Sequence, residues 1–435
     1  MKTKKLLLLL ILTSIYTLSN AQKLNTSPLT RYGIGEIYFQ GNIRQLSMGK
    51  TGIGDFSSYN ITNLNPASVS ALKPNNVIFE FGAMERISLF DNATLQQWDN
   101  FSNIRYIYTG FRVTKGWHTS LGITPYSGIG YKVESYDTVT VNDYSSNYYT
   151  QYDGTGSVNQ FFWSNSFTFF KKFSLAAKLN YTFGSIDRQS SITLTKDDTI
   201  VSSANDTSLY SFTSATVVKD RNLFKNLTYD FGFIYHDTIR IHNKKIKYSL
   251  GAIYSNRQTI NSYMTKITLR SVMLNNRSYS DSLFFDTVST SYFNLPQTYG
   301  FGINISLPKM TFAFDYMTQQ WSGTHIFDTD SYKNTQFIGF GLEYCNDPFS
   351  TRYYRTIRYR LGAYDYSSYI SHNNSQLTSQ AITFGVGLPF KSIIFNFGFV
   401  VGQTGNLDLG LKENFYEINI GISLYDLWFV KRKYM

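Results

Sequence analysis

The chain has 435 residues, of which 42% are hydrophobic, 17% aromatic and only 16% charged, and its formal net charge is +11. Abundant aromatic side chains favour β-strands, and a lone cysteine, Cys345, excludes a disulfide framework. The basic surplus fits the phosphate-rich surface of a Gram-negative envelope as well as an ordinary basic surface, so charge alone does not choose between these two environments.

The first 21 residues have the order of a secretory signal peptide. Lysines precede the apolar run LLLLLILTSIYTL at 6–18, and small residues follow up to Ala21. This run of 13 residues is too short for a membrane-spanning helix, which needs about 20 apolar residues. We therefore expect an exported protein whose mature chain begins at Gln22, and we exclude a helical membrane protein.

Residues 22–75 form a separate unit. They contain scattered glycines, including Gly49, Gly52 and Gly54, and they lack the sustained alternation of a strand. A segment of about 50 residues is too small for a reliable free domain, but it fits the lumen of a β-barrel as a plug. The three glycines would let its backbone pass close to a barrel wall.

The stretch TNLNPASVSAL ends this unit at 62–72. Pro66 fixes its own φ and biases Asn65 away from the helical region, so we expect residues 67–72 to form a short turn of helix beneath the wall. Asn65, Pro66 and Ala67 are therefore candidate plug or gate residues, together with the three glycines. The alternative is an ordinary Asn-Pro turn with no gating role.

Residues 76–435 repeat a period of two. In FSLAAKLNYTFGS at 173–185 and FYEINIGISL at 415–424, apolar residues alternate with mostly polar or small ones. In lipid, every backbone polar group must pair internally, so exported strands of this kind predict an all-β, transmembrane antiparallel β-barrel with an apolar outside and a polar lumen. A soluble sandwich also alternates, but long strands whose apolar faces end in aromatics favour the barrel.

Turn signals divide this region into fourteen expected strands. They lie at 77–90, 103–113, 118–136, 159–170, 173–185, 223–236, 246–272, 292–306, 310–320, 335–345, 355–366, 378–388, 392–402 and 414–425. The long span 246–272 has room for an additional turn. An even number of strands leaves both ends of the mature chain in the periplasm.

The connections between these strands alternate between short and long. Short ones carry lysine, as at 171–172 and 307–309, and outer-membrane barrels have short periplasmic turns and longer external loops. The long polar connections lie near 91–102, 137–158, 186–222, 273–291, 321–334, 367–377 and 403–413. We therefore expect these seven to be external loops.

The third expected strand, 118–136, is interrupted by PYSGIG at 125–130. Proline lacks the N–H that a ladder needs and glycine often marks a bend, so we expect pairing with one neighbour to break here. Unpaired backbone in lipid costs several kcal/mol per group, so water, the plug or a ligand has to satisfy it. Pro125, Gly128 and Gly130 are the candidate lateral opening, and a simple bend that helps the barrel close is the alternative.

Short motifs give the chain a family resemblance. An arginine followed by Met48-Gly49, then Gly52-Ile53-Gly54-Asp55 and Asn65-Pro66-Ala67, resembles the N-terminal plug of the FadL-type long-chain fatty-acid and aromatic-hydrocarbon transporters (FadL/TodX-type). SPLTRYGIGE at 27–36, TPYSGIGY at 124–131 and WFVKRKY at 428–434 are similar to the Bacteroidetes branch of that family. The resemblance implies a fourteen-stranded barrel, a plug, uptake of hydrophobic molecules, and a side opening at a kink in the third strand.

Three functions remain as hypotheses. The first is passive uptake of hydrophobic small molecules through the lumen and the wall. The second is a FadL-like barrel that serves as scaffold or accessory of a protein secretion or assembly complex. The third is an outer-membrane enzyme, which lacks support because no Gly-x-Ser-x-Gly elbow is present and the five histidines, which we expect at the surface, have no metal-ligand spacing.

The expected partners follow from these hypotheses. They are the lipid bilayer and its outer-leaflet lipopolysaccharide, a hydrophobic small-molecule substrate, the barrel-assembly machinery during biogenesis and, for the scaffold, a protein of a secretion complex. Basic and aromatic residues at 105–112 and 352–360 are assigned to lumen arginines and interface tyrosines rather than to nucleic acid. No cofactor and no catalytic residue are expected.

Overall fold

The computed structural model describes most of the chain. The described residues are 27–141, 144–203, 206–241, 244–274, 277–324, 332–372, 375–407 and 410–428. The expected signal peptide, 1–21, lies outside them. Within the described ranges, no helix is long and apolar enough to cross a membrane.

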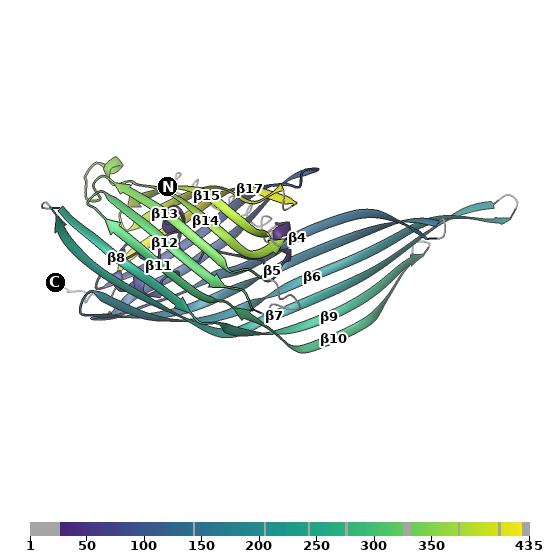
Figure 1. Ribbon diagram of the computed structural model, residues 1–435, viewed down its shortest axis with the longest axis horizontal. Helices are drawn as coiled ribbons and strands as arrows, with labels where there is room; N and C mark the ends of the chain where they lie inside the picture. Colours follow the sequence, from purple (N-terminus) through teal and green to yellow (C-terminus); the bar gives the residue numbers. More distant parts are fainter. Residues whose placement is uncertain are drawn as a thin grey trace, which may run out of the picture.

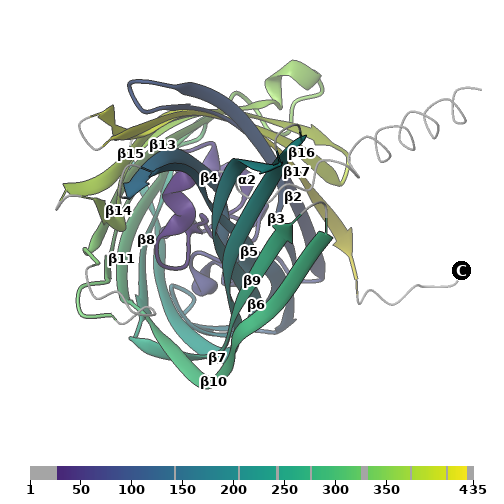
Figure 2. The ribbon, with the colours of Figure 1, turned by 90° about the vertical axis from the view of Figure 1, so that its right-hand side faces the viewer.

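Antiparallel strands form a closed ring (Figures 1 and 2). They are β2 (Asn76–Asp91), β3 (Gln96–Thr114), β4 (Trp117–Val141), β5 (Tyr144–Phe169), β6 (Phe173–Ser203), β7 (Asp206–Ile241), β8 (Lys244–Ser255), β9 (Gln258–Leu274), β10 (Arg277–Leu295), β11 (Gln297–Ser306), β12 (Met310–Gln320), β13 (Thr335–Cys345), β14 (Arg358–His372), β15 (Ser375–Phe390), β16 (Ile393–Asn406) and β17 (Leu411–Leu427). The ring closes where β17 pairs with β2.

Two lines of the wall consist of two strands each. Both β8 and β9 pair antiparallel with β7, so β9 continues β8 beyond Asn256 and Arg257. In the same way β10 pairs with β9 and β11 with β8, on either side of Pro296. If β8 with β9 and β10 with β11 are each counted as one interrupted strand, the wall crosses the membrane fourteen times, which confirms the expected number of strands. The span 246–272 contains a break in its pairing and no reversal of direction.

The outer face of the ring is apolar and the inner face polar. On β17, Tyr416, Ile418 and Ile420 are exposed on the outside, whereas the inward Glu417 and Asn419 are buried. An exposed apolar belt around a closed sheet is the surface that lipid requires, and a water-soluble sandwich would instead bury its apolar faces. The expected transmembrane barrel is therefore confirmed, and the sandwich is excluded.

A curved sheet continues far beyond the ring (Figure 1). It consists of the outlying parts of β4, β5, β6, β7, β9 and β10, which pair in that order. We call this part the wing and define it as the described residues of the hairpins 131–157, 186–222 and 261–291. The strands β6 and β7 have 31 and 36 residues, whereas about 10 suffice to cross a membrane. The excess of about 20 residues reaches roughly 65 Å at 3.3 Å per residue.

The wing corrects the expected external loops. Residues 137–158, 186–222 and 273–291 belong mostly to paired strands and not to loops. These residues show no alternation of apolar and polar side chains in the sequence, because both faces carry Ser, Thr, Tyr and charged residues. This composition is expected of strands that lie outside the lipid bilayer. The connections 91–102, 367–377 and 403–413 are likewise shorter than expected, since strands fill most of each.

The N-terminal segment lies inside the ring (Figure 2). We call residues 27–75 the plug. Its elements are η1 (Pro28–Arg31), β1 (Glu36–Ile37), α2 (Ile43–Leu46) and η2 (Pro66–Ala71). The expected helical turn at 67–72 is present as the 3₁₀ helix η2, and the first barrel strand follows at Asn76.

Candidate functional site

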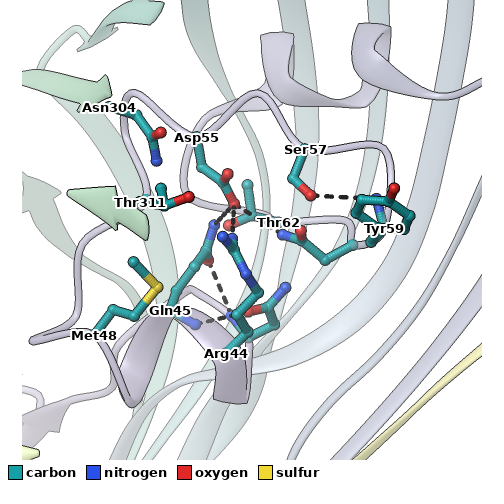
Figure 3. A network of polar contacts seen from close by, with 12 residues as sticks. Arg44, Gln45, Met48, Asp55, Ser57, Tyr59, Thr62, Asn304 and Thr311 are labelled. Carbon is teal, nitrogen blue, oxygen red and sulfur yellow. Dashed lines mark hydrogen bonds and ion pairs between the residues drawn. The ribbon is translucent and has the colours of Figure 1, made fainter. Parts of the chain in front are cut away.

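A buried ion-pair network joins the plug to the barrel wall. Figure 3 shows the part of it within the plug, where Arg44 and Gln45 contact Asp55. Asn42 caps the N-terminus of helix α2, and its side chain and that of Gln45 form a reciprocal capping box. This short helix presents Arg44, which binds Asp55 of the plug at 2.7 Å and Glu343 of β13 through two hydrogen bonds of 3.0 and 3.1 Å. Burial lowers the pKa of Arg44, and the two carboxylates more than offset this, so its pKa lies above the ordinary value.

Wall residues extend this network. Glu343 also accepts a hydrogen bond from Arg360 of β14 at 2.7 Å, and Asp315 of β12 accepts from the backbone N–H groups of Gly52 and Ile53 at 2.6 and 2.7 Å. Hydrogen bonds with a charged partner are stronger than those between neutral groups. Here both the plug and the wall contribute charged side chains. The plug is therefore fixed to the wall by polar contacts and not only by packing.

Asn65 and Pro66 form a second attachment point. The Asn65 side chain accepts from the Ala67 N–H at 3.0 Å, which caps η2, and its amide donates to the carbonyls of Ile53 at 2.7 Å and Phe233 of β7 at 3.2 Å. Asn65, Pro66 and Ala67 thus lie together, buried against the wall. Their role as a gate stays a prediction.

Two of the three candidate glycines touch the wall directly. A Cβ at Gly49 would lie 2.2 Å from the Phe340 carbonyl oxygen, and one at Gly54 would lie 2.8 Å from the Gly302 carbonyl group. Gly52 differs, since its Cβ would collide with the Gln45 side chain within the plug. Close backbone approach explains Gly49 and Gly54, whereas internal packing explains Gly52.

The expected break in strand pairing occurs on β4. The ladder between β3 and β4 ends at the pair Ile107 and Ile123, whereas the ladder between β4 and β5 continues to Val141 with a bulge between Pro125 and Ser127. Beyond Ile123, the two strands β3 and β4 separate. We call this the β3–β4 seam.

The plug satisfies the freed edge of β4. Strand β1 pairs Glu36 with Gly128 and Ile37 with Ser127. The Gln40 side chain donates to the Pro125 carbonyl at 3.1 Å, and the Thr30 hydroxyl exchanges hydrogen bonds with both backbone groups of Gly130 at 3.1 Å. Pro125, Gly128 and Gly130 therefore mark where the wall changes its partner from β3 to the plug. That they form an opening stays a prediction.

A cavity of about 170 Å³ lies between the plug and the wall. Its lining includes Tyr38, Leu64 and Pro66 of the plug, with Tyr126 next to the seam, and it is mainly apolar. An apolar cavity of about 150 Å³ holds a molecule as small as benzene. This space therefore suits one small apolar solute rather than a long chain.

A hydrophobic cluster packs the plug against the wall at the base of the wing. Trp321, Tyr332 and Tyr369, from the ends of the shorter strands, pack with Ile34 of the plug and Phe293 of β10. The Tyr369 hydroxyl donates to the Gly35 carbonyl at 2.7 Å, and the Trp321 and Tyr369 rings stack at 4.5 Å. We call this cluster the roof.

Asp315 and Glu343 were not predicted from the sequence, whereas Arg360 is one of the expected lumen arginines of 352–360. All three occupy inward positions on the consecutive wall strands β12, β13 and β14. In the sequence, each of these residues is a charged residue on the polar face of a strand. That position indicates the lumen, but it does not identify the oppositely charged residue with which the side chain pairs. Only the folded plug brings Arg44 to Glu343.

The histidines also depart from expectation. His118 of β4 is buried, and the His236 ring of β7 stacks on Phe56 of the plug at 3.8 Å. The expectation of surface histidines is wrong for these two, because both belong to the inner face that the plug covers. The side chains of His242, His325 and His372 lie outside the described part of the chain.

Comparisons with known proteins agree with this fold. The BamG family model matches residues 2–435, and no curated protein matches the sequence. The Pseudomonas putida toluene transporter TodX is 13% identical over 93% of this chain and 100% of its own, with a TM-score of 0.51. The CymD monoaromatic hydrocarbon channel is 12% identical, covers 89% and 98%, and has a TM-score of 0.49.

The likeness to TodX extends to the fold alone. It confirms a closed barrel that resembles the FadL/TodX transmembrane barrels, as the sequence motifs predicted. A Pseudomonas aeruginosa FadL homologue is 10% identical over 91% of this chain and 100% of its own, with a TM-score of 0.45. The expected resemblance to the transporters therefore holds for the architecture, and the family model that matches the sequence is BamG.

Proposed function

Because the chain belongs to the BamG family, we propose that it is an accessory scaffold of a barrel-assembly machinery in the outer membrane of a Gram-negative bacterium. The family name points to that machinery. The barrel would anchor the chain in the bilayer and its lipopolysaccharide leaflet, with both ends of the mature chain in the periplasm. The wing would project on the outer side.

The wing is the observation that carries the proposal. It offers two free edges, on β4 and on β10, that extend well beyond the lipid belt. An uncovered sheet edge is a template for another chain, and soluble proteins usually avoid one. A channel needs no structure of this size, whereas a scaffold does.

The attachment of the plug supports the same proposal. The plug is held by Arg44, Asp315 and Asn65, and the roof packs against it at the base of the wing. Breaking a buried ion pair leaves an uncompensated charge, which typically costs about 3–5 kcal/mol. A plug held in this way suits a rigid support better than an open pore.

Shortening the wing tests the proposal. Replacing residues 190–218 with an Asn-Gly turn removes matched lengths of β6 and β7, because Gln189 and Lys219 are paired. We expect the barrel to fold and the co-purified assembly machinery to be lost. In the matched control, the exposed connection 347–352 at the other end of the barrel is replaced instead. This variant should still co-purify with the assembly machinery. Equal retention by both variants would refute a scaffold that acts through the wing.

Uptake of a small apolar solute is the second candidate function. The cavity and the adjoining β3–β4 seam favour it, since together they offer a space and a place in the wall without a ladder. Leu64→Trp should fill the cavity and abolish uptake of a toluene-sized tracer, while Ile303→Trp on the outer face should not. A wild-type chain that gives no uptake above background would eliminate this candidate.

A further inference from the structure

The wing has one edge whose chemistry specifies a partner. Strand β10 pairs with β9 from Arg277 to Leu295, and among the described residues no strand pairs with its other side. Its continuation β11 pairs with β12, so the open side begins where the line leaves the ring. In Figure 1, β10 forms the lower border of the wing.

Charges alternate across the sheet toward this edge. The registers align Arg188 of β6 with Asp220 of β7, Asp220 with Lys266 of β9, and Lys266 with Asp286 of β10. Directly opposed charges of opposite sign stabilise neighbouring strands. The row runs positive, negative, positive, negative, and it ends in an acid at the open side.

A bulge adds a second acid to the same face. The register shifts between Ser282 and Phe284, so Asp281 lies opposite Arg270. Lys266 and Arg270 are four residues apart on β9 and share a face, because side chains alternate with a period of two. Asp281 and Asp286, five apart in sequence, therefore also share that face.

Apolar side chains between these acids are exposed. Leu283 and Phe285 are 56% and 67% exposed. A long apolar edge strand left open is an aggregation hazard, and natural proteins cover it or break it with charges. Each of the two acids lies opposite a base on β9, so its charge is balanced within the sheet. The acids therefore do not protect the open edge of β10 from another strand.

We propose that the open edge of β10 binds an extended strand of another protein, which adds to the sheet and carries a Lys or Arg at two positions four residues apart. The two bases would continue the charge rows beside Asp281 and Asp286, and apolar residues of the added strand would cover Leu283 and Phe285. Strand addition supplies main-chain hydrogen bonds, and side chains supply selectivity. This inference rests on the proposed scaffold function and names its partner class.

Hydrogen exchange monitored by mass spectrometry tests the inference. The tagged chain is compared alone and in the complex that it retains after gentle extraction. We expect amides of 277–286 to exchange about tenfold more slowly in the complex, while those of 131–138 on the other free edge stay unchanged. Asp286→Lys should remove this protection and Asp286→Glu should keep it. Asp137→Lys, the same charge change on the β4 edge, is the matched control and should also keep it.

The outcomes separate the inference from the proposed function. Assembly components that co-purify without protection of 277–286 would overturn strand addition and leave the scaffold intact. Protection that appears in the isolated chain at high concentration would assign the edge to a second copy and also overturn the inference. A chain that retains no assembly component would remove the scaffold function and this inference with it.

Discussion

Arg44 of the plug donates two hydrogen bonds to Glu343 of the barrel wall, at 3.0 and 3.1 Å, across 299 residues of sequence. Glu343 in turn accepts from Arg360, and Arg44 reaches Asp55, so two acids and two bases share one buried cluster. The plug contributes the pair Arg44 and Asp55, and the wall contributes the pair Arg360 and Glu343. The ion pair between Arg44 and Glu343 joins the two parts.

Removing Arg44 should loosen the plug. Arg44→Met leaves Asp55 and Glu343 without their shared cation, and the expected loss is about 3–5 kcal/mol of unfolding free energy. Urea unfolding followed by tryptophan fluorescence measures it. Arg352→Met, at an exposed arginine in the connection to β14, is the control and should change stability by less than about 0.5 kcal/mol. Equal stability of the two variants would show that the cluster does not hold the plug.

Wall glycines should resist substitution where the plug backbone touches them. A Cβ at Gly251 would lie 1.9 Å from the Ile53 carbonyl oxygen, and one at Gly362 would lie 2.1 Å from the Gly49 nitrogen. Gly251→Ala and Gly362→Ala should each expose the plug to limited proteolysis in detergent. Ala363→Val adds bulk at the neighbouring outward position and should not. Unchanged protection in both glycine variants would contradict the close contact.

The sequence allowed the barrel to be predicted because its signal is local. Alternation such as that of 415–424 reports a strand with one apolar face, and short lysine-bearing turns mark where strands reverse. The break at Pro125 was also predictable, since proline removes a ladder donor. The sequence left water, the plug or a ligand as partners of the freed edge. It could not identify Thr30 and Glu36, because these plug residues reach β4 only through the tertiary fold.

Gly128 of the β3–β4 seam leaves no room for a larger side chain. A Cβ at Gly128 would lie 2.3 Å from the Tyr38 hydroxyl, so valine there would collide with the plug instead of restoring the ladder between β3 and β4. Gly128→Val should therefore displace β1 and speed hydrogen exchange over 36–40. Adding Tyr38→Phe removes the clashing oxygen and should restore part of the protection. A Gly128→Val chain with native exchange in this segment would contradict the close packing of plug and seam.

The sidedness of the barrel can be tested with single cysteines in a Cys345→Ser background. Ile192 is exposed on the wing, and Lys171 is exposed in the turn between β5 and β6. A membrane-impermeant maleimide added to intact cells should label Ile192→Cys and spare Lys171→Cys, and both should react after lysis. The reverse pattern would place the wing in the periplasm and refute the assigned topology.

The wing and the choice of function were not predictable from the sequence alone. Strands in water need no apolar face, so Ser, Thr and charged residues at 186–222 had the composition of a loop. Pairing over the full length of β6 and β7 becomes visible only in the register that aligns Arg188 with Asp220. Motifs in the plug pointed to a transporter because the fold is shared, and a fold does not determine function.

The central claim is most directly tested by the composition of what the tagged wild-type chain retains after gentle extraction from native membranes. Quantitative mass spectrometry of proteins and small molecules in one sample measures both candidate functions together. The scaffold account predicts a barrel-assembly protein in a fixed molar ratio to the chain, with no apolar solute bound in a comparable amount. A chain recovered without assembly proteins but with one small hydrophobic molecule per barrel would contradict the scaffold and favour uptake.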